Sequence, residues 1–252
     1  MQTDRNLCIG FCPGGRVMKL LLALIATASI VLPVLNATSI RGSRELASEA
    51  RTLEPFRSIR VTNAADVTIE QGDAQSLTIR TDTNILPLIS TKVEHGCLVI
   101  SDLEKNLKPS ELTVEIIVPE LEAIDITGVS DVRGRGVLTG DSFKISVSGS
   151  ADVDLRLDVG KLQTRVTGAC DLDLNGKAKT QVIQISGSGD VSASDLATVS
   201  TDLEISGHGD CVVAASDKLN IEISGVGQVR YRGQPEVTKS ITGLGDVART
   251  ED

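Results

Sequence analysis

One seven-residue motif recurs along the second half of the chain and constrains its fold more than any other feature. It reads ISGSGDV at residues 185–191, ISGHGDC at 205–211 and ITGLGDV at 241–247. Aligned on the first glycine, seven copies follow one another at spacings of 21, 19, 19, 20, 18 and 18 residues. The aligned glycines are Gly128, Gly149, Gly168, Gly187, Gly207, Gly225 and Gly243. A period of this length is typical of a solenoid.

Apolar residues stand at even offsets from each glycine. Two residues before it are Ile126, Val147, Val166, Ile185, Ile205, Ile223 and Ile241, and four after it are Val132, Val153, Leu172, Val191, Cys211, Val229 and Val247. A third row, four residues before the glycine, is apolar except at Thr164 and Lys239. Even offsets share one face of an extended chain, so these rows predict the interior. Lys144, Gln184, Glu204 and Glu222 are then predicted to point outward.

The glycine and the residue two positions after it are uniformly small, which indicates a sharp corner where backbones come close. We therefore predict an all-β fold, a right-handed parallel β-helix with coils of 18–21 residues. The less regular third of each repeat is long enough for a short third strand. The alternative is an antiparallel repeat in which each ISGxGDV motif forms a hairpin.

A degenerate copy of the motif lies upstream, at residues 59–69. Asn63 occupies its glycine position, as expected where left-handed backbone is required. We predict one domain over residues 54–247, with irregular first coils at 54–120 and regular repeats at 121–247. Residues 38–53 are predicted to be a linker and residues 248–252 a tail.

The N-terminus has the pattern of a secretory signal peptide. Lys19 precedes the apolar run LLLALIATASIVL, and Ala37 offers a small residue at a cleavage point. The run is shorter than the ~20 residues that span a bilayer. We predict a signal peptide at residues 1–37, with Met18 as the alternative start of translation, and a mature protein that is not integral to the membrane.

Charge and composition argue against nucleic-acid binding. Without residues 1–37 the chain keeps 22 basic and 33 acidic residues, a net charge of −11, which repels phosphate backbones. Aromatic residues make up 2% of the sequence, so stacking platforms are scarce. The mature chain keeps three cysteines, Cys97, Cys170 and Cys211. An odd number gives no complete disulfide framework, and we expect Cys170 and Cys211 to be small core residues.

Three stretches together resemble a known family: FRSIRVTNAADVTIEQG at 56–72, VEIIVPELEAIDITGVSDV at 114–132 and the repeated ISGxGDV. In order and spacing they are similar to the putative autotransporter adhesin family, head GIN domain, over residues 54–247. This resemblance implies an exported bacterial protein with a β-helical fold. It brings no catalytic residues and no cofactor.

Few residues offer enzymatic chemistry. His95 and His208 lie in turn-like contexts and are expected to be solvated rather than catalytic. Parallel β-helices also host polysaccharide lyases and hydrolases, so such an enzyme is the alternative function by analogy of fold. Its substrate would need basic residues near the coils, for which the candidates are Arg133, Arg135, Arg156, Arg165, Arg230 and Arg232.

An aspartate stands three residues after most of the glycines. The row comprises Asp131, Asp152, Asp171, Asp190, Asp210 and Asp246, with Gln228 as the exception and Asp66 in the degenerate copy. The odd offset turns it outward, and a parallel stack would space the carboxylates by ~5 Å. We expect each carboxylate to accept backbone N–H groups within its own turn. A calcium-binding ladder is the alternative.

These observations favour a non-catalytic binding or scaffold module of the cell envelope, either periplasmic or secreted to the cell surface. The expected partner is an unknown protein or glycan of the envelope.

Overall fold

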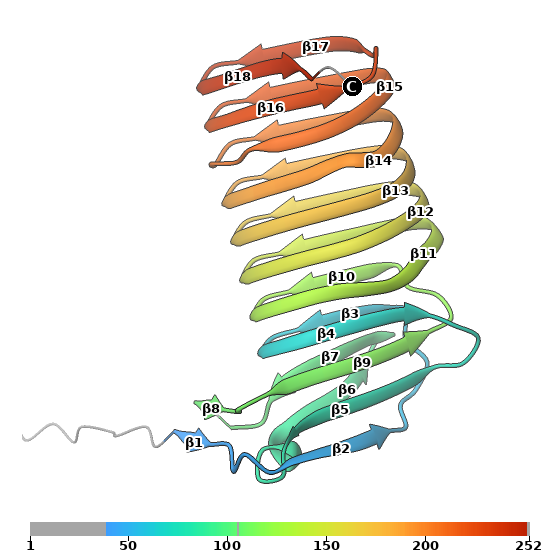
Figure 1. Cartoon of the computed structure of the whole chain (residues 1–252), viewed down its shortest axis with the longest axis vertical. Helices are drawn as coiled ribbons and strands as arrows, with labels where there is room; N and C mark the ends of the chain where they lie inside the picture. Colours follow the sequence, from blue (N-terminus) through green and yellow to red (C-terminus); the bar gives the residue numbers. More distant parts are fainter. Residues whose placement is uncertain (1–38, 105, 251–252) are drawn as a thin grey trace, which may run out of the picture. The chain divides into compact units, whose positions relative to one another are not determined.

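The computed structural model describes residues 39–104 and 106–250. Apart from a 3-10 turn at Leu86–Leu88, its regular elements are strands. They stack as a β-solenoid of about seven turns (Figure 1). The predicted signal peptide and the start at Met18 lie outside the described residues.

Four long strands make the regular coils: β11 (Val129–Val147), β12 (Ser150–Val166), β13 (Ala169–Ile185) and β14 (Ser188–Ile205). Neighbouring coils pair in parallel. The register is continuous between β12 and β13, and it shifts once between β11 and β12 (Arg133/Val137) and once between β13 and β14 (Asp173/Gly176). In Figure 1 the near strands run to the right and the far strands return to the left while the chain climbs, which makes the solenoid right-handed. The predicted parallel β-helix is thus confirmed and the hairpin alternative is wrong.

The less regular third of each repeat does not form a separate strand. It is the bend in which each long strand passes from the near sheet to the far sheet, on the right of Figure 1. Pairing between β12 and β13 continues through this bend, where Leu157 aligns with Gly176. Hydrogen bonding to the next coil keeps the backbone extended there, so the predicted third strand is absorbed into its neighbours.

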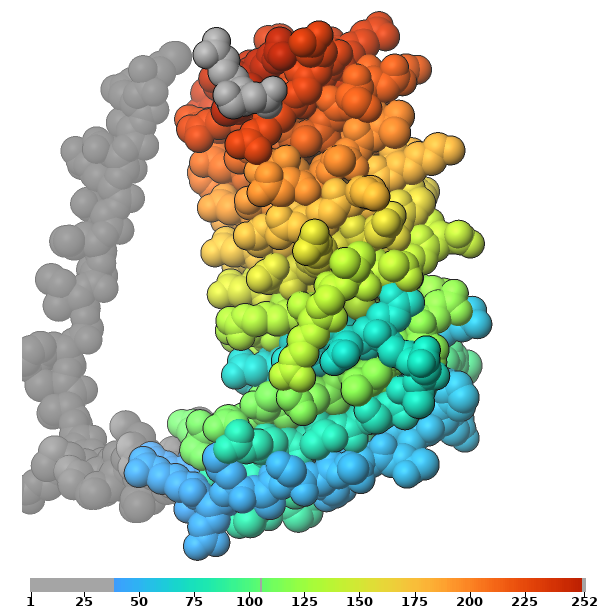
Figure 2. Space-filling model, turned by 45° about the vertical axis from the view of Figure 1, so that its right-hand side comes forward, coloured from blue at the N-terminus to red at the C-terminus, as the bar shows by residue number. Residues whose placement is uncertain are grey.

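The inward rows form one continuous aliphatic core. Ile185 and Val191 are 1% and 2% exposed, and the row departure Thr164 is buried as well. The predicted outward residues Lys144, Glu204 and Glu222 are exposed, and Gln184 is half-buried. Figure 2 shows the coils as successive packed layers. The period of two predicted from the sequence is therefore confirmed.

The corner glycines are required by the approach of one coil to the next. A Cβ added at Gly187 would collide with the carbonyl oxygen of Gly168, and one at Gly207 with that of Gly187. The positive-φ glycines are others: Gly96, Gly136, Gly176 and Gly233. Glycine at the corner therefore makes room for a backbone carbonyl and does not supply left-handed backbone.

Asn63 corrects the expectation drawn from its position, because it does not have a positive φ. Beneath the strand that precedes it, β3 (Ser58–Val61), lies β7 (Cys97–Asp102), which belongs to a hairpin and not to a coil corner. A side chain fits here, and the Asn63 amide donates to the Asp102 carboxylate at 2.9 Å. Asn is tolerated at the first corner because no corner glycine lies beneath it.

The predicted first coils, residues 54–120, are only partly coils. The strands β3 and β4 (Ala64–Gln71) form one, and β9 (Leu112–Val118) and β7 lie parallel beneath them. The next strands, β5 (Ser76–Asp82) and β6 (Ile89–Glu94), run antiparallel to these. The hairpin between β6 and β7 turns at His95 and Gly96, both with positive φ, as such turns require. We call β2 (Leu46–Arg51), β5, β6, β7 and β9 the cap.

The predicted linker at 38–53 contains two strands. β2 (Leu46–Arg51) pairs antiparallel with β5, and β1 (Ile40–Arg41) pairs with β8 (Leu107–Lys108). The alternating polar residues of LASEAR suit an edge strand. This short pattern does not predict a strand by itself, before the partner strand is known. These residues therefore belong to the folded unit.

A buried carboxylate fastens this segment to the cap. Asp82 is fully buried, and it accepts hydrogen bonds from the Arg44 N–H at 2.6 Å and from the N–H and hydroxyl of Ser110 at 2.7 and 2.8 Å. Desolvation alone would raise the pKa of Asp82. The hydrogen bonds from Ser110 and Arg44 outweigh it, so the pKa lies below its ordinary value.

The last coil ends with exposed strands. It comprises β17 (Glu236–Ile241) and β18 (Leu244–Arg249), which follow β15 (Cys211–Ile223) and β16 (Val226–Arg232). The predicted tail, residues 248–252, therefore begins inside β18. The inward positions of the last coil carry two charges, because Lys239 aligns with Ile221 and Arg249 with Tyr231. Inward charges oppose the stacking of a further strand.

Candidate functional site

A cleft of about 890 Å³ lies at the cap. Its lining comes from strand ends and connections on the side where the regular coils bend, at the right of Figure 1. The lining residues are Ala50–Leu53, Pro55–Ser58, Gln75–Leu77, His95, Gly96, Pro119, Glu120 and Glu122. Its volume is within the ~300–1,000 Å³ of small-ligand sites.

One wall of the cleft is the segment between β2 and β3, and Gln75 holds it in place. The Gln75 side-chain oxygen accepts from the Phe56 N–H at 3.2 Å, and its amide nitrogen donates to the carbonyls of Leu53 and Glu54 at 3.3 and 3.0 Å. A single side chain thus satisfies three backbone groups. This wall is therefore formed before any ligand arrives.

Arg57 joins that wall to the loop between β9 and β10 (Ala123–Ile126). Its guanidinium lies 3.1 Å from the Glu120 carboxylate and 3.2 Å from that of Glu122. The backbones are joined as well, since the Glu122 N–H donates to the Arg57 carbonyl at 2.7 Å. These side chains are largely exposed, so the ion pairs alone add little stability, but together with the backbone bond they fix the width of the cleft.

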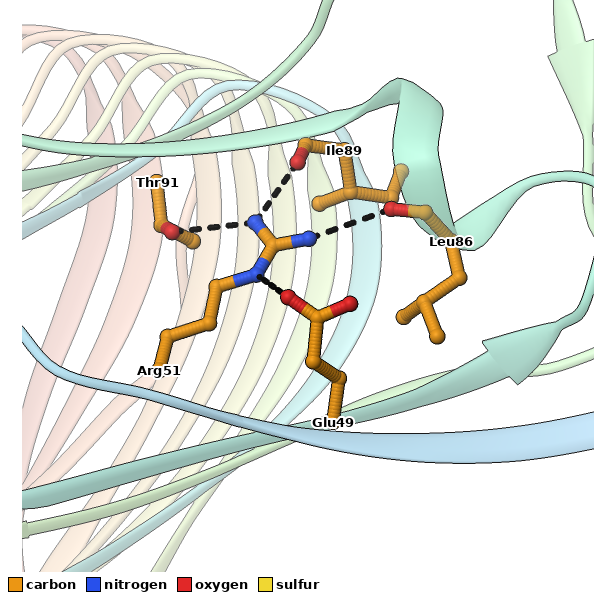
Figure 3. Close-up of polar contacts among 5 residues, drawn as sticks. All are labelled: Glu49, Arg51, Leu86, Ile89 and Thr91. Carbon is orange, nitrogen blue, oxygen red and sulfur yellow. Dashed lines mark hydrogen bonds and ion pairs between the residues drawn. The ribbon is translucent and has the colours of Figure 1, made fainter.

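Arg51, the last residue of β2, connects this strand to neighbouring segments of the cap (Figure 3). It donates to the carbonyls of Ile89 and Leu86 at 2.7 and 3.1 Å and to the Thr91 hydroxyl at 3.0 Å. Glu49 is its ion partner at 2.9 Å. The guanidinium thereby joins β2 to the 3-10 turn and to the start of β6.

The chemistry of the cleft suits binding. Its exposed apolar lining residues are Ala50, Pro55 and Pro119, and Phe56 and Leu77 lie behind them, 3% and 2% exposed. On the rim, the charges of Arg57, Glu120 and Glu122 are tied to one another. Sequence reasoning missed this site because its residues come from four separate connections, which no periodic signal relates.

The predicted aspartate row is aligned in the structure. Asp131 pairs in register with Asp152, Asp152 with Asp171 and Asp171 with Asp190, and Asp246 lies beside Gln228. Among the described residues no group of three His, Cys, Asp or Glu side chains is placed to hold a metal ion. The calcium alternative therefore has no ligand cluster to support it.

The hydrogen bonds of this row differ from the expected ones. Asp190 accepts the backbone N–H of Asp210 at 3.1 Å, and Asp210 accepts that of Gln228 at 2.9 Å. These bonds join one coil to the next, whereas the prediction placed them within a turn. They form here because ladder pairing begins one residue later: between β14 and β15 it begins at Val191 and Cys211, and between β15 and β16 at Cys211 and Val229. The N–H groups of Asp210 and Gln228 are therefore available to the carboxylates.

A shallow acidic groove of about 500 Å³ runs beside the row. Asp154 and Asp173, five residues after their glycines, form its second wall, and Arg133 stands at its border. Their shared offset of five residues from the glycine is visible in the sequence, but the prediction did not include these two aspartates. The groove is a strip of solvated carboxylates over the near sheet.

The other residues with possible chemistry are dispersed. His95 lies in the cap hairpin and His208 at a coil corner, and both are exposed. Of the arginines considered for a polysaccharide enzyme, Arg135 pairs with Glu115 at 3.0 Å, Arg133 with Asp131 at 3.4 Å and Arg232 with Asp195 at 3.4 Å. Arg156, Arg165 and Arg230 are exposed on other coils. The structure does not bring these residues together into one site.

All three described cysteines are free thiols. Burial, with Asp171 and Asp152 nearby, raises the pKa of Cys170 to about 12. Burial, with Asp190 and Asp210 nearby, likewise raises the pKa of Cys211 to about 12. Both are core residues as predicted, and Cys97 is half-buried in the cap.

Comparison with solved structures finds the same fold in bacterial proteins. A putative adhesin from Bacteroides fragilis is 25% identical, with a TM-score of 0.79 over 84% of this chain and 100% of that one. A putative adhesin from Parabacteroides distasonis is 23% identical (TM-score 0.61, 84% and 100% covered). A putative lipid binding protein from the same species is 20% identical (TM-score 0.66, 85% and 100% covered).

No curated protein matches the chain. No helix in residues 39–104 and 106–250 is long and apolar enough to cross a membrane.

A family model described as "Putative auto-transporter adhesin, head GIN domain" matches residues 55–235, which include the first coil, the cap strands after it and all but the last coil. The chain belongs to this head GIN domain family.

Proposed function

We propose that this protein is an exported, non-catalytic binding module of the bacterial envelope, periplasmic or displayed at the cell surface. In this proposal the cap cleft contacts an envelope protein or glycan. The regular coils serve as a spacer between the cap and the opposite end of the solenoid. Membership of a family named for adhesins supports this role and an envelope or extracellular location.

The preformed cleft is the observation that carries the proposal. Its walls are fixed by Gln75 and Arg57 through contacts within the chain, so binding there requires little ordering. The enzyme alternative has less support, because its arginines are dispersed over different coils and three of them are paired with carboxylates.

A cleft-filling variant tests the proposal. Ser76 is an exposed lining residue, so Ser76→Trp should fill the cleft without disturbing the core. Ser142→Trp is the matched control, because Ser142 is an exposed strand residue that does not line the cleft. Both variants and the unmodified mature protein would be used to capture partners from envelope extracts.

We expect the unmodified protein and Ser142→Trp to retain the same envelope component, and Ser76→Trp to lose it by about tenfold or more. Equal capture by all three proteins would refute the role of the cleft. Turnover of acidic or neutral glycans above a boiled control would refute a non-catalytic function.

A further inference from the structure

We infer that the far sheet of the coils binds a second copy of this chain, with the two solenoids antiparallel. This inference goes beyond the proposed function, because the surface that it concerns does not include the cap cleft. It follows from the charges on the far-sheet parts of β11 to β15, which are residues 142–147, 161–166, 180–185, 200–205 and 218–223.

The exposed charges of this surface are separated by sign along the solenoid. In β11 and β12 they are all basic: Lys144, Lys161 and Arg165. In β14 and β15 they are acidic apart from one lysine: Asp202, Glu204, Glu222 and Lys218. The strand between them, β13, presents the uncharged residues Thr180, Val182 and Gln184. One half of the surface is therefore basic, the other half is acidic, and β13 is the boundary.

Such a surface is complementary to itself when a second copy is turned over. A two-fold axis along β13 would place β12 of each copy against β14 of the other, and β11 against β15. Arg165 and Glu204 lie in one column with Gln184, so Arg165 of each copy would face Glu204 of the other. Facing sheets lie ~10 Å apart, a gap that an arginine and a glutamate side chain bridge together. The same ion pair would thus form twice.

This arrangement brings no like charges face to face between β11 and β15. Each of the other charges would lie opposite an uncharged residue, as Asp202 would lie opposite Gln163. The near sheet differs, because the same rotation would set Asp152 against Asp190 of the second copy. Like charges in direct opposition disfavour association. The far sheet is therefore the face that suits a second copy.

The side chains of the predicted ion pair are already held in place. Arg165 donates to the side-chain oxygen of Gln184 at 2.6 Å, and the Gln184 amide donates to the Glu204 carboxylate at 3.0 Å. Because these bonds restrict both charged side chains before association, dimer formation orders few further groups. Among the residues that the structure describes, Lys144 and Glu222 form no ion pair. Their charges are therefore available to the second copy.

The dimensions of the surface suit a specific contact. A shallow groove of about 340 Å³ lies over its acidic half, where Asp202, Glu204 and Glu222 line it, and it would receive the basic half of the second copy. From β10 to β17 the sheet is ~30 Å wide at ~4.8 Å per strand, and six residues of strand are ~20 Å long. Two copies would then bury ~1,200 Å² in total, the lower end of the range for specific interfaces.

Charge reversal, followed by sedimentation velocity over a range of protein concentrations, tests the inference on the mature protein. We expect the unmodified protein to dimerise, and Arg165→Glu and Glu204→Arg each to raise the dimer dissociation constant at least about tenfold. Each variant alone would set like charges against each other. In an equimolar mixture of the two variants, opposite charges would face each other at both contacts, so the mixture should recover a dimer as tight as the unmodified one.

Two matched controls change the net charge by the same amounts outside the proposed interface. Arg156→Glu and Asp154→Arg alter exposed residues in the part of β12 that precedes the bend, and we expect them to leave the dissociation constant unchanged. Three results would each overturn the inference: monomers of the unmodified protein at every soluble concentration, a dimer that both far-sheet reversals leave intact, or a mixture of the two variants that does not recover it.

Discussion

The regular coils and the cap bury similar aliphatic cores by different means. From β11 to β14 the coils are held by columns of like residues, so that Asp152 lies beside Asp171 and Val153 beside Leu172. The cap is held by single polar side chains, each of which joins segments distant in sequence, as Gln75 and Asp82 do. Substitutions in the coils should therefore lower stability at inward positions and have little effect elsewhere. The stability of the cap should instead depend on individual polar contacts.

The largest effect is expected from a charge placed in a coil column. Ile185→Asp would put a carboxylate at a position that is 1% exposed, so we expect a loss of about 4 kcal/mol of unfolding free energy. Gln184→Asp, one residue away and outward, should cost less than ~1 kcal/mol. Denaturant unfolding measures both, and equal losses would show that the columns do not carry the stability.

Exchanging residues between two corners sharpens the comparison. Gly187→Asn would drive a side chain into the Gly168 carbonyl, and we expect it to cost about 2–3 kcal/mol. Asn63→Gly, at the corner above the cap, loses only the hydrogen bond to Asp102 and should cost about 1 kcal/mol. Thermal unfolding distinguishes them, and an equal cost would contradict the argument from coil approach.

Acid should loosen the cap before the coils. The folded pKa of Asp82 lies below its unfolded value, which is ~3.9. Its contribution to stability is therefore present above that value and is lost as the pH falls through the folded pKa. Hydrogen exchange between pH 5 and 2 should show earlier loss of protection at Arg44 and Ser110 than in β13. Asp82→Asn should remove this difference in pH dependence; its persistence would assign the effect to another group.

The smallest effect is expected for the coil thiols. With a pKa of about 12, Cys170 and Cys211 have almost no thiolate at pH 8. In the native protein they should react with an alkylating reagent roughly a thousandfold more slowly than a free thiol. Cys97, which is half-buried, should react first. Peptide mapping after timed alkylation checks the order, and early labelling of Cys211 would reveal opening of the coils.

The sequence predicts whatever recurs and misses whatever occurs once. The burial of Ile185 and Val191 followed from even offsets, because a strand alternates its faces. The replacement of glycine by Asn63 was misread, because its cause is the strand beneath it and not its own backbone. The hydrogen bonds of Asp190 were predicted within its own turn, whereas they join two coils, since they depend on where ladder pairing starts. The cleft was missed because Phe56, Gln75 and Glu122 meet only through the path of the connecting loops.

The charged inward positions of the last coil have a consequence for evolution. Since Lys239 and Arg249 end the stack at one side and the antiparallel strands end it at the other, the copy number of coils between them can vary freely. Tandem duplication of the gene segment for one coil would lengthen the solenoid by one strand spacing, ~4.8 Å. Every column would continue through the inserted coil, and the cap would keep its contacts. Length and recognition could then be selected independently.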